Sequence, residues 1–175
     1  MGFDWWKHLQ IRKLLVKRKG IKTQNVSHTV MAQRIEAADS LDNFPTPPWA
    51  TRAFMEHVIS EKGPFDSRSC LEPACGAGQM AEPLKECFGE VFAKDIHGYG
   101  YGQITDFLNA PLRASSVDWL ITNPPFRLAE QFIMRALMAA RCGVAMLTRT
   151  VFIESVGRYE RLFERNPPTC VRRQP

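Results

Sequence analysis

The pattern of hydrophobic and polar positions between residues 46 and 164 switches between two periods. Short apolar runs with the length and composition of buried strands occupy residues 69–72, 90–95, 117–122 and 144–148. Apolar positions at helical spacing predict helices that begin at Thr46 and end before Gly63, and that cover residues 76–88, 128–137 and 157–164. Arg141 and Gly143 are typical helix-ending residues after the third of these helices. The alternation of strand and helix predicts a parallel α/β sheet.

Length and composition exclude several classes of protein. With 175 residues, of which 45% are hydrophobic and 23% charged, the chain suits one folded domain with its own core. No run approaches the roughly 18 apolar residues of a transmembrane helix. The five cysteines form no Cys-x-x-Cys pair, so we expect reduced, mostly buried thiols in a cytoplasmic protein. The four histidines have no metal-ligand spacing, and no metal is implied.

Positive charge is concentrated at the N-terminus. The net charge is +5, but residues 1–30 carry seven basic residues and one acidic residue and therefore hold +6. The remaining residues, 31–175, hold −1. We interpret residues 1–30 either as a basic arm that contacts phosphates or another anionic surface, or as an adventitious extension. Residues 31–175 are interpreted as the folded domain.

Three features follow predicted strands at the end where doubly wound sheets bind ligands. Gly76 and Gly78 form a strand-to-helix turn in which backbone can approach a ligand closely. Asp95 ends the second strand, where a carboxylate suits the hydroxyls of a ribose. Asp106 and Phe107 follow a glycine-rich loop, and such a pair can accept a hydrogen bond from an adenine amino group and pack on its ring.

The motif Asn123-Pro124-Pro125-Phe126 directly follows the apolar strand 117–122. Two prolines cannot donate hydrogen bonds to a sheet, and they can simply stop a strand. An asparagine and an exposed aromatic, however, have no shared packing role there. The Asn123 side chain and the Pro124 carbonyl can each accept a hydrogen bond from one amino group, while Phe126 can stack on a planar ring. The motif therefore predicts a clamp for a planar amine that is to be alkylated.

In this order and spacing, these motifs resemble those of Rossmann-like S-adenosylmethionine-dependent methyltransferases that act on amines. The chain most resembles the phage and prophage DNA N6-adenine methyltransferases, over residues 44–168. Segment 44–50, Phe-Pro-Thr-Pro-Pro-Trp-Ala, adds to this, because its Thr-Pro element resembles the family's N-terminal cofactor motif. The resemblance implies an α/β Rossmann-like methyltransferase fold with a mostly parallel sheet. It also implies S-adenosyl-L-methionine as cofactor and DNA as partner, with no metal and no membrane.

The resemblance further implies a role for each matching residue. The catalytic set that holds the substrate amine is Asn123, Pro124, Pro125 and Phe126. The cofactor-binding set is Thr46, Pro47, Glu72, Pro73, Ala74, Gly76, Gly78, Asp95, Asp106 and Phe107. In this assignment Thr46 and Pro47 frame the methionine part of the cofactor, and Glu72 lies near its amino group. Asp95 takes the ribose hydroxyls, Asp106 the adenine amino group, and Phe107 forms a wall of the adenine slot.

Other substrates remain open, because the same clamp occurs in families that resemble guanine-N2 RNA methyltransferases and glutamine-N5 protein methyltransferases. All these substrates present a planar amine beside a carbonyl or a ring nitrogen. A catalytically defunct remnant that binds without turnover is a further alternative. Nothing in residues 44–175 resembles a separate target-recognition domain, so the chain does not indicate which DNA sequence it would recognise.

The C-terminal residues predict an incomplete sheet. Folds of the resembled family carry seven strands, of which the last two form a hairpin that covers the edge beside the fifth. After the turn at residues 166–168, only Thr169, Cys170 and Val171 remain as strand formers. We therefore expect a domain truncated before the C-terminal strand hairpin, with a sixth strand of at most three residues. The fifth strand then leaves an unpaired apolar edge, through which we expect self-association.

Overall fold

The structure, a computed structural model, describes residues 44–172. In chain order, its labelled helices and strands are α1 (Pro48–His57), β1 (Ser69–Glu72), α2 (Ala81–Lys85), β2 (Glu90–Asp95), β3 (Gln103–Ile104), β4 (Val117–Thr122), α3 (Ala129–Ala139), β5 (Ala140–Met146) and α4 (Val156–Arg158). Short 3₁₀ turns occupy Ser60–Lys62, Phe126–Leu128 and Thr150–Glu154, and a π-helical turn occupies Tyr159–Phe163.

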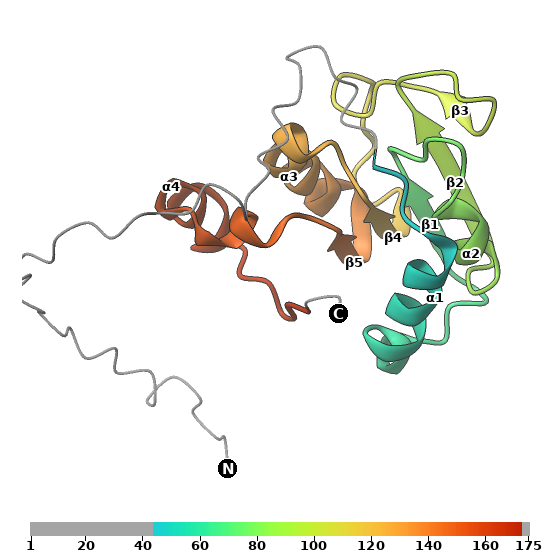
Figure 1. Cartoon of the computed structure of the whole chain (residues 1–175), viewed down its shortest axis with the longest axis horizontal. Helices are drawn as coiled ribbons and strands as arrows, with labels where there is room; N and C mark the ends of the chain where they lie inside the picture. Colours follow the sequence, from blue (N-terminus) through green and yellow to red (C-terminus); the bar gives the residue numbers. More distant parts are fainter. Residues whose placement is uncertain (1–43, 173–175) are drawn as a thin grey trace, which may run out of the picture. The chain divides into compact units, whose positions relative to one another are not determined.

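The five strands form one parallel sheet in the order β3-β2-β1-β4-β5 (Figure 1). Cys70 of β1 pairs with Val91 of β2 on one side and with Trp119 of β4 on the other. This is the order of the first five strands of a doubly wound α/β fold, and it reverses between β1 and β4. The predicted parallel α/β sheet is confirmed.

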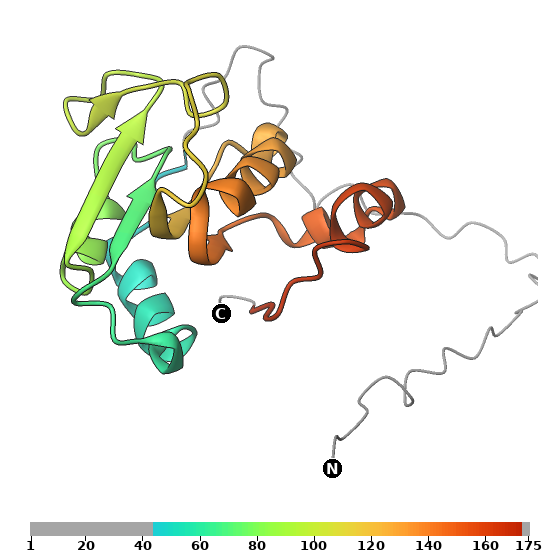
Figure 2. The same ribbon diagram turned by 180° about the vertical axis from the view of Figure 1, so that it is seen from behind.

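The two faces of the sheet are buried under different helices, which Figures 1 and 2 show from opposite sides. Successive residues of a strand point to opposite faces. Trp119 and Ile121 of β4 therefore pack with α1 and α2, while Leu120 between them packs with Phe132 and Ala136 of α3. Both faces are covered, which agrees with the continuous apolar runs of a buried parallel sheet.

Several predicted boundaries are wrong, and the short strand β3 was not predicted. The helix expected over residues 76–88 is limited to α2, because residues 73–80 form turns beside the cavity described below. Pro83 is tolerated as the third residue of α2, where a backbone N–H has no helical partner. Arg141 and Gly143 do not end α3 but lie within β5, which begins directly after the helix. Gly143 packs against the Trp119 ring, and a Cβ at this position would overlap that ring.

The segment after β5 packs on the beginning of α3. Phe152 and Leu162 form a small core with Ala129, and Glu130 beside it pairs with Arg158 and Arg161. The short helical turns after β5 therefore pack on α3 and not beside β5, as Figure 1 shows for α4.

The expected sixth strand at residues 169–171 is wrong. Residues 169–171 are exposed and irregular, and they do not belong to the five-stranded sheet. Within residues 44–172, β5 is therefore an edge strand of the sheet.

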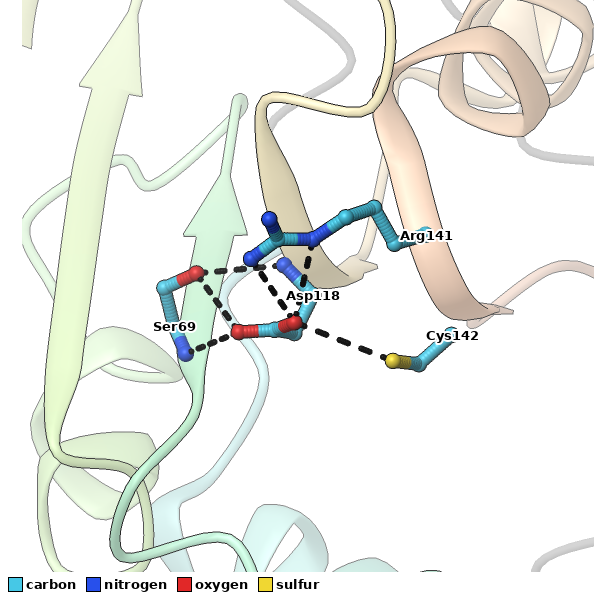
Figure 3. Close-up of polar contacts among 4 residues, drawn as sticks. All are labelled: Ser69, Asp118, Arg141 and Cys142. Atoms are coloured by element: carbon cyan, nitrogen blue, oxygen red, sulfur yellow. Dashed lines mark hydrogen bonds and ion pairs between the residues drawn. The ribbon is translucent and has the colours of Figure 1, made fainter.

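A polar cluster joins three strands at their amino ends, opposite the cavity (Figure 3). Asp118 Oδ2 accepts hydrogen bonds from the Ser69 backbone N–H at 2.9 Å and from the Ser69 hydroxyl at 3.1 Å. Asp118 Oδ1 accepts from Arg141 Nη2 at 2.9 Å and Nε at 3.2 Å. The Ser69 backbone N–H, followed by the Ser69 hydroxyl and Arg141, lowers the pKa of Asp118. The ionised carboxylate thus connects β1, β4 and β5.

All five cysteines are free thiols. Cys70 and Cys75 are buried and Cys87 is half-buried, but Cys142 and Cys170 are exposed. The expectation of mostly buried thiols therefore fails for the two cysteines nearest the C-terminus, since β5 is an edge strand and residue 170 lies in the exposed tail.

Candidate functional site

A cavity of about 550 Å³ lies at the carboxyl ends of β1, β2 and β4. The strand order reverses between β1 and β4, and doubly wound sheets bind their ligands at this position. Small-molecule sites span roughly 300–1,000 Å³, so the volume suits a ligand of that size. The expected site residues that line the cavity are Thr46, Glu72, Pro73, Ala74, Gly76, Asp95, Asp106, Phe107, Asn123 and Pro125.

Four expected residues do not line it: Pro47, Gly78, Pro124 and Phe126. Pro47 is exposed immediately before α1, and Pro124 is buried beneath the wall. Gly78 is covered by the Tyr101 ring, and Phe126 is covered by the Phe44 ring.

The turn after β1 brings backbone to the cavity wall. Gly76 has a φ of 53°, a left-handed conformation that glycine adopts without steric cost, and its N–H donates to Asp95 Oδ2 at 2.9 Å. Gly78 has a φ of 89°, and its α-carbon lies against the Tyr101 ring, which a Cβ would overlap. In this structure Gly78 therefore accommodates Tyr101, while Gly76 faces the cavity.

Cys75, in the same turn, is a buried thiol. Burial, followed by the negative charges of Glu72 and Asp95, raises the pKa of Cys75 to about 11. The thiolate is the nucleophilic form of cysteine, so this side chain is unreactive at neutral pH. This agrees with the expectation of reduced, buried thiols.

Asp95 joins the turns that follow β1 and β2. Its carboxylate is 8% exposed and accepts N–H bonds from Gly76 and His97, both at 2.9 Å. The two oxygens of a carboxylate offer about four lone-pair sites, so Asp95 keeps capacity for hydroxyl donors of a ligand. The bonds hold the carboxylate in a fixed position in the cavity wall.

Glu72, the last residue of β1, is a buried carboxyl with an unpaired oxygen. Its side chain is 2% exposed, and Oε2 has no hydrogen-bond partner in the part of the chain that the structure describes. Burial raises the pKa of Glu72 well above its ordinary value, and the neighbouring Asp95 raises it further. Buried polar atoms without partners are uncommon and costly. The position therefore favours a ligand that brings a donor or a positive charge.

Asp106 and Phe107 lie together in the opposite part of the wall. Asp106 Oδ2 accepts from Asn109 Nδ2 at 2.7 Å, and Oδ1 accepts from the Leu108 N–H at 2.9 Å. The Asn109 side chain, followed by backbone N–H groups, lowers the pKa of Asp106. Phe107 is 6% exposed and packs on the Phe132 ring, with the centroids 5.2 Å apart. Asp106 thus shapes its own turn, and its ionised carboxylate borders the cavity.

Asn123 presents an unpaired acceptor at the cavity. Its Nδ2 donates to the Phe44 carbonyl at 2.8 Å and to Thr46 Oγ1 at 3.0 Å. Its Oδ1 is buried and has no partner within the described residues. The amide is therefore held at one end only.

Phe126 is covered by Phe44. The two rings are stacked, with centroids 5.4 Å apart and planes at 21°. The Arg149 guanidinium lies 4.7 Å from the Phe126 centroid and 5.8 Å from the Phe44 centroid. On the face of Phe126 opposite Phe44, the guanidinium would lie much farther from the Phe44 centroid than 5.8 Å. Arg149 therefore lies beside both rings.

Several residues of the cavity wall were not anticipated from the sequence. They are Phe44, Gln79, His97, Tyr99, Arg127, Leu128 and Phe132. His97 and Tyr99 follow Asp95 closely, and the proximity to a ligand-binding strand end is the signal that could have identified them. Phe132 has the helical spacing of a core residue and does pack in the core. The sequence pattern therefore does not indicate that it also lines the cavity.

The described residues 44–172 contain no group of three or more His, Cys, Asp or Glu side chains placed to hold a metal ion. In the same part of the chain, no helix is long and apolar enough to cross a membrane.

No protein-family model matches the chain, and no curated protein matches it in sequence. Solved structures do match. The "putative RNA methyltransferase" from Pyrococcus horikoshii is 18% identical at a TM-score of 0.53, over 70% of this chain and 67% of that chain. A SAM dependent methyltransferase from Aquifex aeolicus is 18% identical at a TM-score of 0.41, over 55% of this chain and 68% of that chain.

Phosphoethanolamine N-methyltransferase 1 from Haemonchus contortus, solved with phosphoethanolamine and S-adenosylhomocysteine, is 19% identical at a TM-score of 0.41. The match covers 54% of this chain but only 24% of that enzyme. At 18% identity, the match to the Pyrococcus horikoshii protein establishes the architecture alone. Together with the strand order, the match to the Pyrococcus horikoshii protein shows that residues 44–172 have an α/β, Rossmann-like methyltransferase fold.

Proposed function

We propose that this chain uses S-adenosyl-L-methionine to methylate an exocyclic amine, and that the acceptor is N6 of adenine in DNA. The observation that carries this proposal is a pair of buried acceptor oxygens, Glu72 Oε2 and Asn123 Oδ1. Neither oxygen has a partner among residues 44–172, and both residues line the same cavity. Since buried acceptors are normally satisfied, the cavity suits a ligand set with N–H donors at both places.

The cofactor fits the chemistry of the wall. S-adenosylmethionine carries a positive sulfonium and a positive ammonium group, and Glu72, Asp95 and Asp106 place three carboxyl groups around the cavity. Glu72 would hold the ammonium group and Asp95 the ribose hydroxyls. Asp106 would accept from the adenine amino group, with Phe107 as a wall of the slot. When bound, the cofactor supplies an electrophilic methyl group.

The amine clamp, Asn123 to Phe126, would activate the acceptor. An exocyclic ring amine is a poor nucleophile because its lone pair is delocalised into the ring. Asn123 Oδ1 would accept one N–H and the Pro124 carbonyl the other; because Pro124 does not line the cavity in this structure, the second bond would require a local rearrangement. Two such bonds favour a pyramidal nitrogen and return the lone pair. No covalent intermediate is needed, in keeping with the protonated thiol of Cys75.

A polyanionic substrate is supported by two exposed arginines beside the clamp. Arg127 lines the cavity, and Arg149 lies against Phe126. Positive side chains near the reacting amine favour a nucleotide phosphate over a protein glutamine. In duplex DNA the base must leave the stack, which costs a few kcal/mol, and stacking on an aromatic side chain can return about 1–3 kcal/mol.

The direct test is transfer of radiolabelled methyl groups from S-adenosylmethionine to DNA that lacks N6-methyladenine, to RNA and to a protein extract. Digestion of labelled DNA to nucleosides then identifies the methylated base. We expect label in DNA as N6-methyladenine. Label only in RNA or only in protein would favour guanine-N2 or glutamine-N5 as acceptor, and calorimetric cofactor binding without any transfer would identify a defunct remnant.

The clamp is tested by Asn123→Ala. Its hydrogen bond serves the reacting amine, so the variant should bind the cofactor almost normally and lose methyl transfer. Asn166→Ala is the matched control, because this asparagine lies outside the cavity and contacts the Leu162 carbonyl. Normal turnover by Asn123→Ala would contradict the assigned role of the clamp.

A further inference from the structure

The side-chain amide of Asn123 is held by the strap, defined here as residues Phe44–Thr46, which precedes α1. Asn123 Nδ2 donates to the Phe44 backbone carbonyl at 2.8 Å and to Thr46 Oγ1 at 3.0 Å. Phe44 and Asn123 are 79 residues apart in the chain, so this contact joins the start of the described fold to the end of β4. Thr46 is only 6% exposed, and water therefore has little access to its hydroxyl.

The strap determines which atom of Asn123 faces the cavity. A backbone carbonyl can only accept a hydrogen bond, so the nitrogen of the amide must point toward Phe44. The oxygen then points away from the strap, where none of the described residues is its partner. If the amide turned over, its oxygen would face the Phe44 carbonyl oxygen, and the cavity would meet an N–H donor that cannot accept from an amine. The Thr46 hydroxyl can donate or accept, so Phe44 sets the direction of the amide while Thr46 holds it in place.

We infer that Thr46 is a positioning residue for the methyl acceptor, acting through its hydrogen bond to Asn123. This inference rests on the proposed function and gives Thr46 a different role from the one that the resemblance implies. The resemblance assigned Thr46 to the methionine part of the cofactor, whereas its hydroxyl here orients the amide that would bind the reacting amine. Thr46 and Phe44 together keep Asn123 Oδ1 available as an acceptor.

The test compares Thr46→Val, which keeps the shape but removes the hydroxyl, with Thr46→Ser, which keeps the hydroxyl. We expect Thr46→Val to lower kcat for DNA methylation roughly 3- to 10-fold, the effect of one lost hydrogen bond. Its cofactor Kd should stay unchanged, and Thr46→Ser should retain most of the activity. Thr51→Val is the matched control, because Thr51 is another buried threonine near the strap whose hydroxyl has no partner.

Two outcomes would overturn the inference: a weaker cofactor Kd with kcat unchanged, or identical kinetics for Thr46→Val and Thr51→Val. A readout without turnover separates this inference from the proposed function. In the ¹⁵N–¹H spectrum, the side-chain NH₂ signals of Asn123 should shift in Thr46→Val and not in Thr51→Val. If the shift occurs but the wild-type chain methylates nothing, the hydrogen bond stands and the methyltransferase proposal fails. If no shift occurs, the orientation by Thr46 is refuted whatever the activity.

A separate observation concerns the Phe44 ring. Phe44 lines the cavity while Phe126 does not, and the rings are 5.4 Å apart. A planar group inserted between them needs a separation of about 7 Å, two van der Waals contacts of roughly 3.5 Å each. We propose that Phe44 occupies the stacking position on Phe126 and must leave it when the substrate base enters.

Phe44→Ala keeps the backbone carbonyl that binds Asn123 but removes the competing ring. With an adenine-containing oligonucleotide as substrate, KM should fall by about 2- to 10-fold, as expected from the loss of one aromatic pair. Phe126→Ala should raise KM instead. A rise in KM for both variants would refute the competition and would mean that the two rings bind the base together, whereas an unchanged KM for Phe44→Ala would refute any role of this ring in substrate entry.

Discussion

Replacing Asp118 by alanine removes the carboxylate that joins β1, β4 and β5 at their amino ends (Figure 3). The Ser69 backbone N–H, half-buried in the wild-type protein, loses its acceptor, which costs about 1–3 kcal/mol. The pair with Arg141 adds at most about 1 kcal/mol, because the arginine side chain is 53% exposed. We therefore expect the free energy of unfolding to fall by about 2–3 kcal/mol.

Urea unfolding followed by circular dichroism measures this loss, with exposed Asp66→Ala as control. Asp118→Asn should lose less, because its amide oxygen still accepts from Ser69. The pH dependence has a definite sign. The folded-state pKa of Asp118 is lowered, so its contribution is present above the unfolded pKa of about 3.9 and is lost as pH falls through the folded pKa.

The difference between wild type and Asp118→Ala should therefore be constant near neutral pH and shrink below about pH 4. A loss under about 0.5 kcal/mol, the size of an ordinary surface substitution, would refute the role of this cluster. A difference that stays constant down to pH 3 would refute the ionised state of the carboxylate.

Four further outcomes can be measured. Asp95→Ala should weaken S-adenosylmethionine binding in calorimetry by about 10- to 150-fold, through lost hydrogen bonds worth roughly 1.5–3 kcal/mol; unchanged affinity would contradict the ribose assignment. Cofactor affinity should rise with pH as Glu72, whose pKa is raised by burial, ionises, and Glu72→Gln should abolish that dependence. Sedimentation velocity should reveal concentration-dependent self-association through the β5 edge, which a monomer at all concentrations would exclude. Deleting residues 1–30, which lie outside the described residues, should flatten the salt dependence of DNA binding if the arm contacts phosphates, and an unchanged slope would favour an adventitious extension.

Local patterns along the chain located four of the five strands and ten residues of the cavity wall, whereas the short strand β3 was not anticipated. Apolar runs located β1, β2 and β4, and residues at or just after their carboxyl ends, Glu72, Asp95 and Asn123, meet in one cavity. This follows because parallel strands place their carboxyl ends at the same edge. The start of β5 was misplaced, since a helix-ending glycine and a glycine under the Trp119 ring have the same local sequence signal.

Contacts between distant residues could not be predicted in the same way. The bond from Asn123 to Thr46 joins two motifs that the sequence analysis assigned to different ligands, and only the folded backbone brings them together. The cover of Phe126 by Phe44 likewise depends on where the strap crosses the cavity. Gly78 was expected at the cofactor, but its neighbour Tyr101 comes from a loop whose path has no local sequence signal.

The direct passage from α3 into β5 has a consequence for how the chain tolerates insertions and deletions. The segment leaves Phe126, forms α3 and then β5 without an intervening loop, and returns as Arg149 to within 4.7 Å of the Phe126 ring. The two ends of the segment from Phe126 to Arg149 therefore lie at the same aromatic ring. The helix α3 and the strand β5 between these ends are packed on the sheet. A residue inserted at the junction would have to be absorbed in the helix or in the strand register, where it would displace Arg149 from Phe126. In the loop after β2, a side chain added at the exposed Gly100 meets open space, whereas Gly102 is closely packed, so an extra residue is accommodated best at Gly100. Natural variation in length should therefore concentrate in that loop, while the distance along the chain from Phe126 to Arg149 stays constant.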